Sequence, residues 1–451
     1  MELSSSKQVG MCLIASCNLL TNGMTIAYPA VALPAMMQAN SGLELTLEQM
    51  SWIASLSPLT MIAGSLIIGP LLDKWGRRLG FVLTGIPAVL GWIIIGIMPR
   101  SVACLYIGRL LVGLASGFGG ASASVFMAEV TSPKIRGALT VTKNLTFSIG
   151  LTIMYIIGMV FQDDWSKMAF CGAAVPTLCL LFAIFCLPES EIWLKSNSPN
   201  KPNSPKHSFR ELLKTYRTRP EVYKPMYIMN ALLILRQLSG TSVLMSYAVS
   251  LVKMTGVRGD PHLVTVILGV TRIVAGLTGC ALSGYLGRRV PVSWSGAIMS
   301  ITMLWLARNI RKDNEEPAYW DTLVLIAFMF TSTIFTSICQ ALIGEVFPTD
   351  VRGLCTGITT CLSYLSSFTA LKLYPLLLEF LGKTNLFLLY GTFCVLGALL
   401  AILTLPETKD KTLTEIQGLF SKKKPVVAEV KETDSNPAEV ELLGVTTNSY
   451  R

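Results

Sequence analysis

The chain has 451 residues, of which 52% are hydrophobic and 14% are charged, and its formal net charge is +10 at pH 7. A soluble protein carries about 25% charged residues, so this composition excludes an ordinary soluble domain and favours a protein embedded in a membrane. The positive charge is concentrated in particular loops between apolar segments, so it does not indicate a nucleic-acid partner.

Twelve apolar segments of 18 or more residues follow one another along the chain, and each can cross a bilayer core of about 30 Å. Because lipid cannot satisfy backbone polar groups, and because the segments are too long for barrel strands, each is predicted to be a helix. The predicted spans are 10–37, 49–72, 79–98, 102–127, 138–161, 166–187, 225–254, 262–286, 291–308, 319–344, 354–380 and 384–405. The fold class is therefore predicted to be all-α and integral to the membrane.

Lysine and arginine gather in the loops that follow every second span, and the opposite loops contain fewer. Loops rich in these residues stay in the cytoplasm. Both termini and the long loop at 188–224 are therefore predicted to be cytoplasmic. The polar stretch after about residue 420 is predicted to be disordered.

The charged motifs occur twice, about 215 residues apart. The matching pairs are WGRR at 75–78 with LGRR at 286–289, AEVTSPKIRG at 128–137 with GEVFPTDVRG at 344–353, and LPES at 187–190 with LPET at 405–408. A duplicated membrane unit is typical of a transporter built from two helical bundles that move about a site between them. The predicted parts are an N-terminal bundle at 1–187, a cytoplasmic linker with short helices at 188–224, a C-terminal bundle at 225–405 and a cytoplasmic tail at 406–451.

These motifs, in this order, resemble the sugar-porter branch of the major facilitator superfamily, and most of all insect facilitative sugar transporters of the trehalose type. Further strings that carry the resemblance are GPLLDKWGRR (69–78), GRLLVGLASG (108–117), PESEIWL (188–194), RQLSGTSVLMSYA (236–248) and PETKDKTLTEI (406–416). The resemblance implies twelve transmembrane helices in two pseudo-symmetric six-helix bundles, with facilitative sugar transport by alternating access through a central cavity. It also implies a monomer in the plasma membrane, a small solute and the lipid bilayer as partners, and no cofactor or metal.

The charged residues of the two repeats are predicted to form two clusters at cytoplasmic helix ends, where charges can stay hydrated. Pairs between neighbouring helix ends can hold the cytoplasmic side shut and separate when the bundles move; the alternative is that they only fix the topology. The first cluster comprises Asp73, Arg77, Arg78, Glu129, Arg136 and Glu189, and the second comprises Arg288, Arg289, Glu345, Arg352 and Glu407. Gly284 stands where the family has an acidic residue, so the second cluster is expected to be weaker or differently paired.

Candidate substrate contacts are polar side chains in the middle of the spans, because a sugar needs neutral donors and acceptors. The candidates are Asn144, Arg236, Gln237, Ser242, Tyr247, Arg272, Gln340 and Ser363. Several depart from the family pattern: Arg236 and Arg272 stand where Gln and Asn are usual, and Gln340 stands where Trp is usual.

Arg236 and Arg272 are predicted to lie deep in the membrane, and Lys372 nearer its outer side, with no acidic residue in the middle of their spans. An unpaired charge is unfavourable there, so these cations are predicted to face a wet cavity that attracts an anion, or else to bond to carbonyls at a broken helix turn.

The leading hypothesis is a facilitative sugar carrier. A carrier of an organic anion or another non-sugar solute on the same scaffold is the alternative, and a transport-inactive sensor is a third possibility. The sequence shows no constellation of catalytic residues, so an enzyme is not expected.

Overall fold

The computed structural model of the chain describes residues 5–38, 42–130, 133–196, 219–256, 259–311, 319–348, 351–409, 411 and 413–420. Within these residues every regular element is helical. The helices are α1 (Ser5–Met36), α2 (Leu47–Trp75), α3 (Arg77–Ile97), α4 (Val102–Val130), α5 (Pro133–Val160), α6 (Trp165–Phe185), α7 (Glu191–Ser196), α9 (Pro220–Arg236), η2 (Gln237–Thr241), α10 (Ser242–Ser246), α11 (Ala248–Met254), α12 (Pro261–Leu286), α13 (Arg289–Arg311), α14 (Tyr319–Val346), α15 (Arg352–Thr404) and α16 (Leu413–Phe420).

Eleven helices of the described residues are long and apolar enough to cross a membrane. The longest, α15, is interrupted at Gly382, where φ is 73° and ψ is 170°. Glycine adopts this left-handed backbone without the strain that a side chain would add. Gly382 therefore divides α15 into two spans, which brings the described chain to the predicted twelve.

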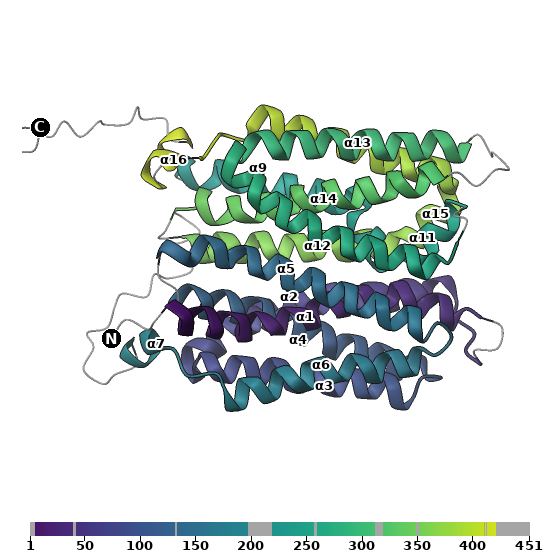
Figure 1. Cartoon of the computed structure of the whole chain (residues 1–451), viewed down its shortest axis with the longest axis horizontal. Coiled ribbons are helices and arrows are strands. Elements are labelled where there is room, and N and C mark those ends of the chain that lie inside the picture. The colour runs from purple at the N-terminus through teal and green to yellow at the C-terminus, as the bar shows by residue number, and fades with distance from the viewer. Residues whose placement is uncertain are drawn as a thin grey trace, which may run out of the picture.

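The helices gather in two groups, α1–α6 in one half of the molecule and α9–α16 in the other (Figure 1). Within the first half α1 packs against α5 and α2 against α4, and within the second half α13 packs against α15 and α12 against α14. The halves meet where α2 contacts α15 and where α5 contacts α12. The second span of each half thus contacts the fifth span of the other, as a pseudo-twofold arrangement requires.

Helix α4 holds the first half together through one buried cation and close packing. Arg109 is 1% exposed, and its Nε donates to the carbonyl of Ile53 at 2.9 Å while its Nη1 donates to that of Thr25 at 2.7 Å. Gly117 lies so near α2 that an added Cβ would stand 2.5 Å from the carbonyl oxygen of Met61. Small residues in α4 therefore allow two helices to approach closely.

The seventh span is broken near its middle, where α9 gives way to η2. At Gly240 φ is 86° and ψ is −1°. A Cβ at this position would also lie 2.7 Å from the Tyr390 ring, so both the backbone and the space require glycine. Irregular backbone at this depth is tolerated only where protein covers it or where it lines a cavity.

Candidate functional site

Arg77 is the centre of the first charge cluster. Its Nη2 donates to Glu129 at 2.7 Å, and its Nε donates to the two carboxylate oxygens of Glu129 at 3.0 and 3.1 Å. Its Nη1 donates to Asp73 at 3.2 Å and to the carbonyl of Leu72 at 2.7 Å. The Arg77 and Glu129 side chains are only 11% and 15% exposed. Removing Arg77 would leave Glu129 as a buried charge without its ion-pair partner, whereas removing Glu129 would leave Arg77 paired with Asp73 alone.

Glu189 contacts the start of α3, directly after the turn that joins it to α2. It accepts hydrogen bonds from the backbone N–H of Arg77 at 2.7 Å and from that of Arg78 at 3.3 Å, at the first residues of α3. A carboxylate is favoured at a helix N-terminus, where backbone donors have no helical partner. The Arg78 side chain donates to the carbonyl of Ile184 in α6. The cluster therefore joins α3, α4 and the segment after α6.

The second cluster repeats this geometry in the other half. Arg288 donates from Nη2 to Glu345 at 2.8 Å. Glu407 accepts from the backbone N–H of Arg288 at 2.9 Å and from that of Arg289 at 3.1 Å. The Arg289 side chain donates to the carbonyl of Ile402 at 2.7 Å. In each half the predicted acids thus contact the arginines of the GRR motif or their backbone N–H groups.

The second cluster is paired differently at one position. Gly284 supplies no side chain to match Asp73, and instead the hydroxyl of Thr408 donates to Glu345 at 2.8 Å. The residue that matches Thr408 in the first repeat is Ser190, whose hydroxyl accepts from the backbone N–H of Trp193 at 3.4 Å. Glu345 therefore has a neutral hydroxyl donor that the sequence did not predict.

The two clusters lie at the same end of the molecule. Figure 1 shows α7, which follows Glu189, and α16, which follows Glu407, at one end of the helices. Arg352 opens α15, and its Nε donates to the carbonyl of Phe347 at 3.2 Å. Arg136 belongs to α5, but its side chain lies outside the described residues.

The two halves are joined at the opposite end. Lys372 in α15 donates to the hydroxyl of Ser51 at 2.9 Å, and its Nζ lies 4.0 Å from the carboxylate of Glu48. The same Nζ lies 4.0 Å from the centre of the Trp52 ring, which adds a cation–π contact. These residues lie near the start of α2, whereas Asp73 lies near its end.

Further hydrogen bonds between the halves come from α10 and the loop before α12. The hydroxyl of Ser246 donates to the carbonyl of Ile26 at 3.0 Å, and the hydroxyl of Tyr155 donates to that of Met245 at 2.7 Å. The amide of Gln162 donates to Asp260 at 3.1 Å. The end of the molecule away from the charge clusters is therefore closed by several contacts.

Neutral polar side chains form a network between the broken seventh span and α15. The amide of Gln237 donates to the hydroxyl of Ser363 at 3.1 Å, and the hydroxyl of Ser242 donates to the amide oxygen of Gln237. Ser367 donates to Ser242 at 3.2 Å. The structure thus brings three predicted candidates together, and it adds Ser367, which the sequence did not single out.

Tyr247 lies just beyond this network. Its hydroxyl donates to the carbonyl of Leu371 at 3.5 Å, and its ring centre lies 4.5 Å from that of Tyr374. Tyr247 is 5% exposed and Tyr374 is 3% exposed. The aromatic pair is therefore buried between the seventh span and α15, beside Leu371, which is next to Lys372 in the chain, and away from the charge clusters.

The two predicted arginines meet the same helix. Arg236 donates from Nη1 to the hydroxyl of Thr336 at 3.0 Å, and Arg272 donates from Nη1 to the hydroxyl of Thr333 at 3.5 Å. Thr333 and Thr336 stand three residues apart, on one face of α14. The guanidinium carbon of Arg272 also lies 5.2 Å from the centre of the Phe147 ring in α5, so this arginine lies at the contact between the halves.

Asn144 and Gln340 are not brought into the network. Asn144 is half-buried in α5, and its backbone carbonyl accepts a hydrogen bond from Ser148 at 2.8 Å. Gln340 is exposed on α14, one turn beyond Thr336. In the described part of the chain neither side chain shares a hydrogen bond with Gln237 or its partners.

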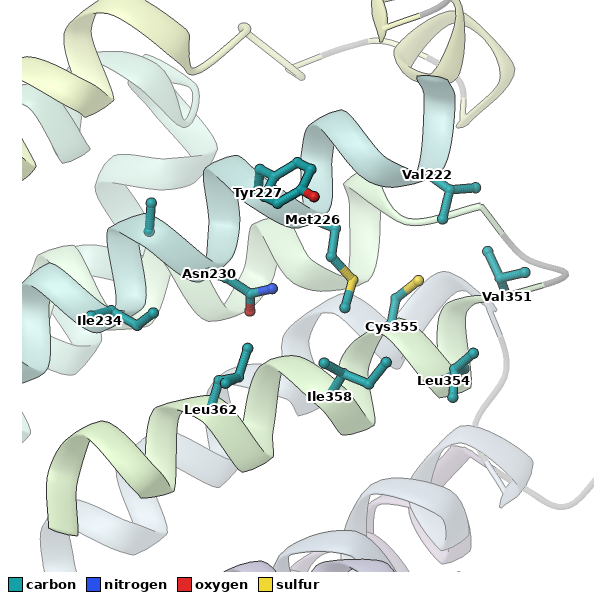
Figure 2. Close-up of a pocket in the computed structure, with 11 residues that line it drawn as sticks. Val222, Met226, Tyr227, Asn230, Ile234, Val351, Leu354, Cys355, Ile358 and Leu362 are labelled. Atoms are coloured by element: carbon teal, nitrogen blue, oxygen red, sulfur yellow. The ribbon is translucent and has the colours of Figure 1, made fainter. Parts of the chain in front are cut away.

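A cavity of about 420 Å³ separates α9 from the first part of α15 (Figure 2). Val222 and Val351 line it near the starts of these segments, and Ile234 and Leu362 lie toward its other end (Figure 2). Its lining is almost wholly apolar, with the buried amide oxygen of Asn230 left without a partner among the described residues. Because Leu362 directly precedes Ser363, the cavity reaches from the side of the clusters toward the polar network.

Thr333, Thr336 and Thr408, like Ser367, make contacts that the sequence did not predict. The segment TSTIFTS at 331–337 offered a signal, because hydroxyl residues three apart share a helix face. Thr408 offered no such signal, since a threonine that follows an acidic residue in the chain does not indicate which distant carboxylate it contacts.

A family model described as "Sugar (and other) transporter" matches residues 11–201 and 195–420. An Anopheles gambiae protein named facilitated trehalose transporter Tret1 is 27% identical over 444 residues, which cover 91% of this chain and 55% of that protein. A Bombyx mori protein with the same name is 27% identical over 415 residues, covering 85% of this chain and 81% of that protein. The chain spans about half the length of several of these relatives.

Two solved structures have a similar fold. The inward open conformation of the xylose transporter XylE from E. coli gives a TM-score of 0.75 at 19% identity, covering 92% of this chain and 100% of that chain. The proton:xylose symporter XylE bound to 6-bromo-6-deoxy-D-glucose gives a TM-score of 0.74 at 20% identity. The match covers 93% of this chain and 100% of that chain. At these identities the likeness shows the fold alone, and it confirms the predicted twelve-helix architecture.

Proposed function

The chain belongs to the sugar (and other) transporter family, and from this premise we propose that it carries a sugar-like solute across a membrane by facilitated alternating access. It is a multi-pass membrane protein. The observation that carries the proposal is the arrangement of contacts along the helices. The halves are bonded to each other at one end, and each has its own charge cluster at the other.

We propose two bundles, 1–187 and 225–405, that move as bodies about the contact between them. Each charge cluster bonds helix ends of its own half, so it makes the cytoplasmic end of that half move as a unit. The contacts of Lys372 with Ser51 and Trp52 close the outer side in this conformation. Opening outward requires these contacts to break, while the clusters keep each bundle intact.

The proposed solute site is the polar network between η2 and α15. Gln237, Ser242 and Ser363 offer neutral donors and acceptors of the kind that a hydroxylated solute requires. Tyr247 stands between this site and the outer side. The relatives' names, facilitated trehalose transporter, support a sugar and a facilitative mechanism. Asn144 and Gln340 remain proposed contacts for another conformation.

The remaining assignments are proposals of the same kind. We place the cluster end in the cytoplasm, because positively charged loops gather there, and both termini on that side. The linker at 188–224 then lies in the cytoplasm as well. A monomer in the plasma membrane is the simplest arrangement, since one chain supplies both bundles and the whole network.

The test is uptake of labelled glucose and trehalose by cells that express the protein. We expect saturable uptake down a concentration gradient, without dependence on a proton gradient. Glu129→Gln should lower the maximum rate about tenfold, equivalent to about 1.4 kcal/mol in the barrier, with little change in KM, because Glu129 bonds Arg77 away from the solute. Arg308→Gln, an exposed change on α13, is the matched control. A raised KM with an unchanged maximum rate would contradict the assigned role.

An organic anion is the second candidate solute. The observation that favours it is the pair of buried arginines beside the polar network.

A further inference from the structure

Arg236 and Arg272 are buried cations whose bonding capacity is largely unused. They are 7% and 5% exposed. Each guanidinium has five N–H groups in a fixed planar fork, and each makes one side-chain hydrogen bond within the described residues, from Nη1. The Nε of both arginines is buried without a hydrogen-bond partner in the described structure.

The threonines that the two arginines contact do not neutralise them. The hydroxyl of Thr336 already donates to the carbonyl of Ser332 at 2.6 Å, and that of Thr333 donates to the carbonyl of Met329 at 2.7 Å. Both hydroxyls therefore act only as acceptors toward the arginines, and they hold the two guanidinium groups against one face of α14. This contact positions the cations and leaves their charge uncompensated.

Neither arginine forms an ion pair within the described part of the chain, in contrast to Arg77 and Arg288. The aromatic face of Phe147 beside Arg272 offers only a weak, partial compensation. Two buried positive charges side by side are unfavourable unless an anion joins them. An anion that presents two oxygens, such as a carboxylate or a phosphate, matches the forked donors of arginine better than it matches the single charge of a lysine.

We propose that Arg236 and Arg272 bind the anionic oxygen group of a small solute, and that the hydroxyl groups of the same solute bind the adjacent network of Gln237, Ser242 and Ser363. This inference rests on the proposed function and adds to it a preference for sugars that carry a carboxylate or phosphate group over neutral sugars. Arg236 bonds Thr336 of α14 and Gln237 bonds Ser363 of α15, so the proposed solute would lie where the seventh span meets these two helices.

Thermal unfolding of the purified protein in detergent tests the binding. The ligands are D-glucuronate, D-glucose and inorganic phosphate, in a buffer without added chloride. We expect glucuronate to raise Tm at concentrations about tenfold or more below those that glucose requires, because hydrogen bonds to a charged group are the stronger ones. Arg236→Gln combined with Arg272→Asn should abolish this preference, so that glucuronate and glucose raise Tm over the same range of concentrations.

Two further variants control for charge and for folding. Arg236→Lys combined with Arg272→Lys keeps both charges without the planar fork, so it should retain a reduced preference for glucuronate. Arg308→Gln should bind like the parent protein. Each shift is measured against the same variant without ligand, so a change in the stability of the unliganded variant does not affect the comparison.

The outcomes distinguish inorganic phosphate from a sugar acid as the anion. They also distinguish a failure of the anion site from a failure of the proposed function. A phosphate response equal to that of glucuronate identifies a general oxyanion site, and a response to glucuronate alone identifies a sugar acid; either result supports the site. The inference is overturned when glucuronate binds no better than glucose, or when the neutral double variant keeps the preference. Continued uptake of labelled glucose in that case leaves the proposed function standing. Glucuronate binding without transport of any sugar would instead refute the function and keep the site.

Discussion

The two charge clusters share a backbone arrangement but differ in how their arginines are paired. Glu189 and Glu407 accept from the same backbone donors at the first residues of α3 and α13. Arg77, by contrast, bonds two acids and is more buried, whereas Arg288 bonds one acid whose side chain is 27% exposed. The duplicated halves have therefore kept the carboxylate that caps the helix, while the partners of the arginine have changed.

The largest difference is expected when the two arginines are removed. Arg77→Ala leaves Glu129 buried and unpaired, so it should lower the free energy of unfolding by about 3–5 kcal/mol. Arg288→Ala should lower it by about 1–3 kcal/mol, because Glu345 is more hydrated and keeps its bond from Thr408. Denaturant or thermal unfolding in detergent measures both. Equal losses would show that the difference in burial has no energetic consequence.

The next effect concerns the hydrogen bond from Thr408 to Glu345, because the matching Ser190 bonds the backbone of Trp193 instead. Thr408→Val should destabilise the protein by about 1–2 kcal/mol, because a buried hydrogen bond to a carboxylate is lost. Thr392→Val is the matched control, since its exposed hydroxyl bonds only the carbonyl of Leu388 in its own helix. A loss as small as that of the control would mean that Thr408 does not compensate for the missing acid.

Restoring the missing acid should have a smaller and opposite effect. Gly284→Asp places a carboxylate four residues before Arg288, as Asp73 stands before Arg77, and an added Cβ meets no atom within 4 Å. The gain should be about 0.3–0.5 kcal/mol, the usual value of such a pair on a helix. Gly284→Asn replaces the glycine without adding a charge, so the difference in stability between the Asp and Asn variants measures the contribution of the ion pair. If both variants gain equally, the charge contributes nothing.

The effect of pH is also expected to be small. Burial raises the pKa of the Glu407 carboxyl, but hydrogen bonds from the backbone N–H groups of Arg288, Lys409, Arg289 and Thr408 outweigh it, so its pKa lies below the ordinary 4.5. The stabilisation by Glu407 is therefore complete above pH 4.5 and is lost as the pH falls through the lowered pKa. The difference in Tm between the parent protein and Glu407→Gln should shrink in that acid range. The Glu407 carboxyl is only half-buried, so solvent still screens its charge. We therefore expect the free energy of unfolding to change by less than about 1 kcal/mol.

The helices and the clusters were predictable because they depend on strong, local signals. Long apolar segments must form helices in lipid, and repeated charged motifs identify equivalent helix ends. The use of Glu189 and Glu407 as helix caps was not predictable, since the sequence shows their charge but not the direction of the backbone donors. Arg77 and Glu129 were predicted only as members of one cluster of charges, and nothing in the sequence indicated Thr408.

The centre of the molecule was less predictable for a different reason. Gln237, Ser242 and Ser363 were identified from the family pattern, and they do form one network. Gln340 was expected beside them because a tryptophan is usual there, yet it is exposed in this conformation. Serines and threonines inside apolar helices commonly bond their own backbone, so Thr333 and Thr336 could not be separated from such residues by sequence alone.

The break at Gly240 divides the seventh span into two helical segments that meet at a bend. The first segment, α9, ends at Arg236. In the second, Ser246 of α10 bonds the facing bundle at Ile26, whereas Tyr247 bonds Leu371 of its own bundle. The bend between them is fixed by the left-handed backbone of Gly240 and by the Tyr390 ring beside it. The arginine at the end of α9 and the serine that bonds the facing bundle therefore belong to separate helical segments, so the direction of each can be set independently on its own side of one glycine.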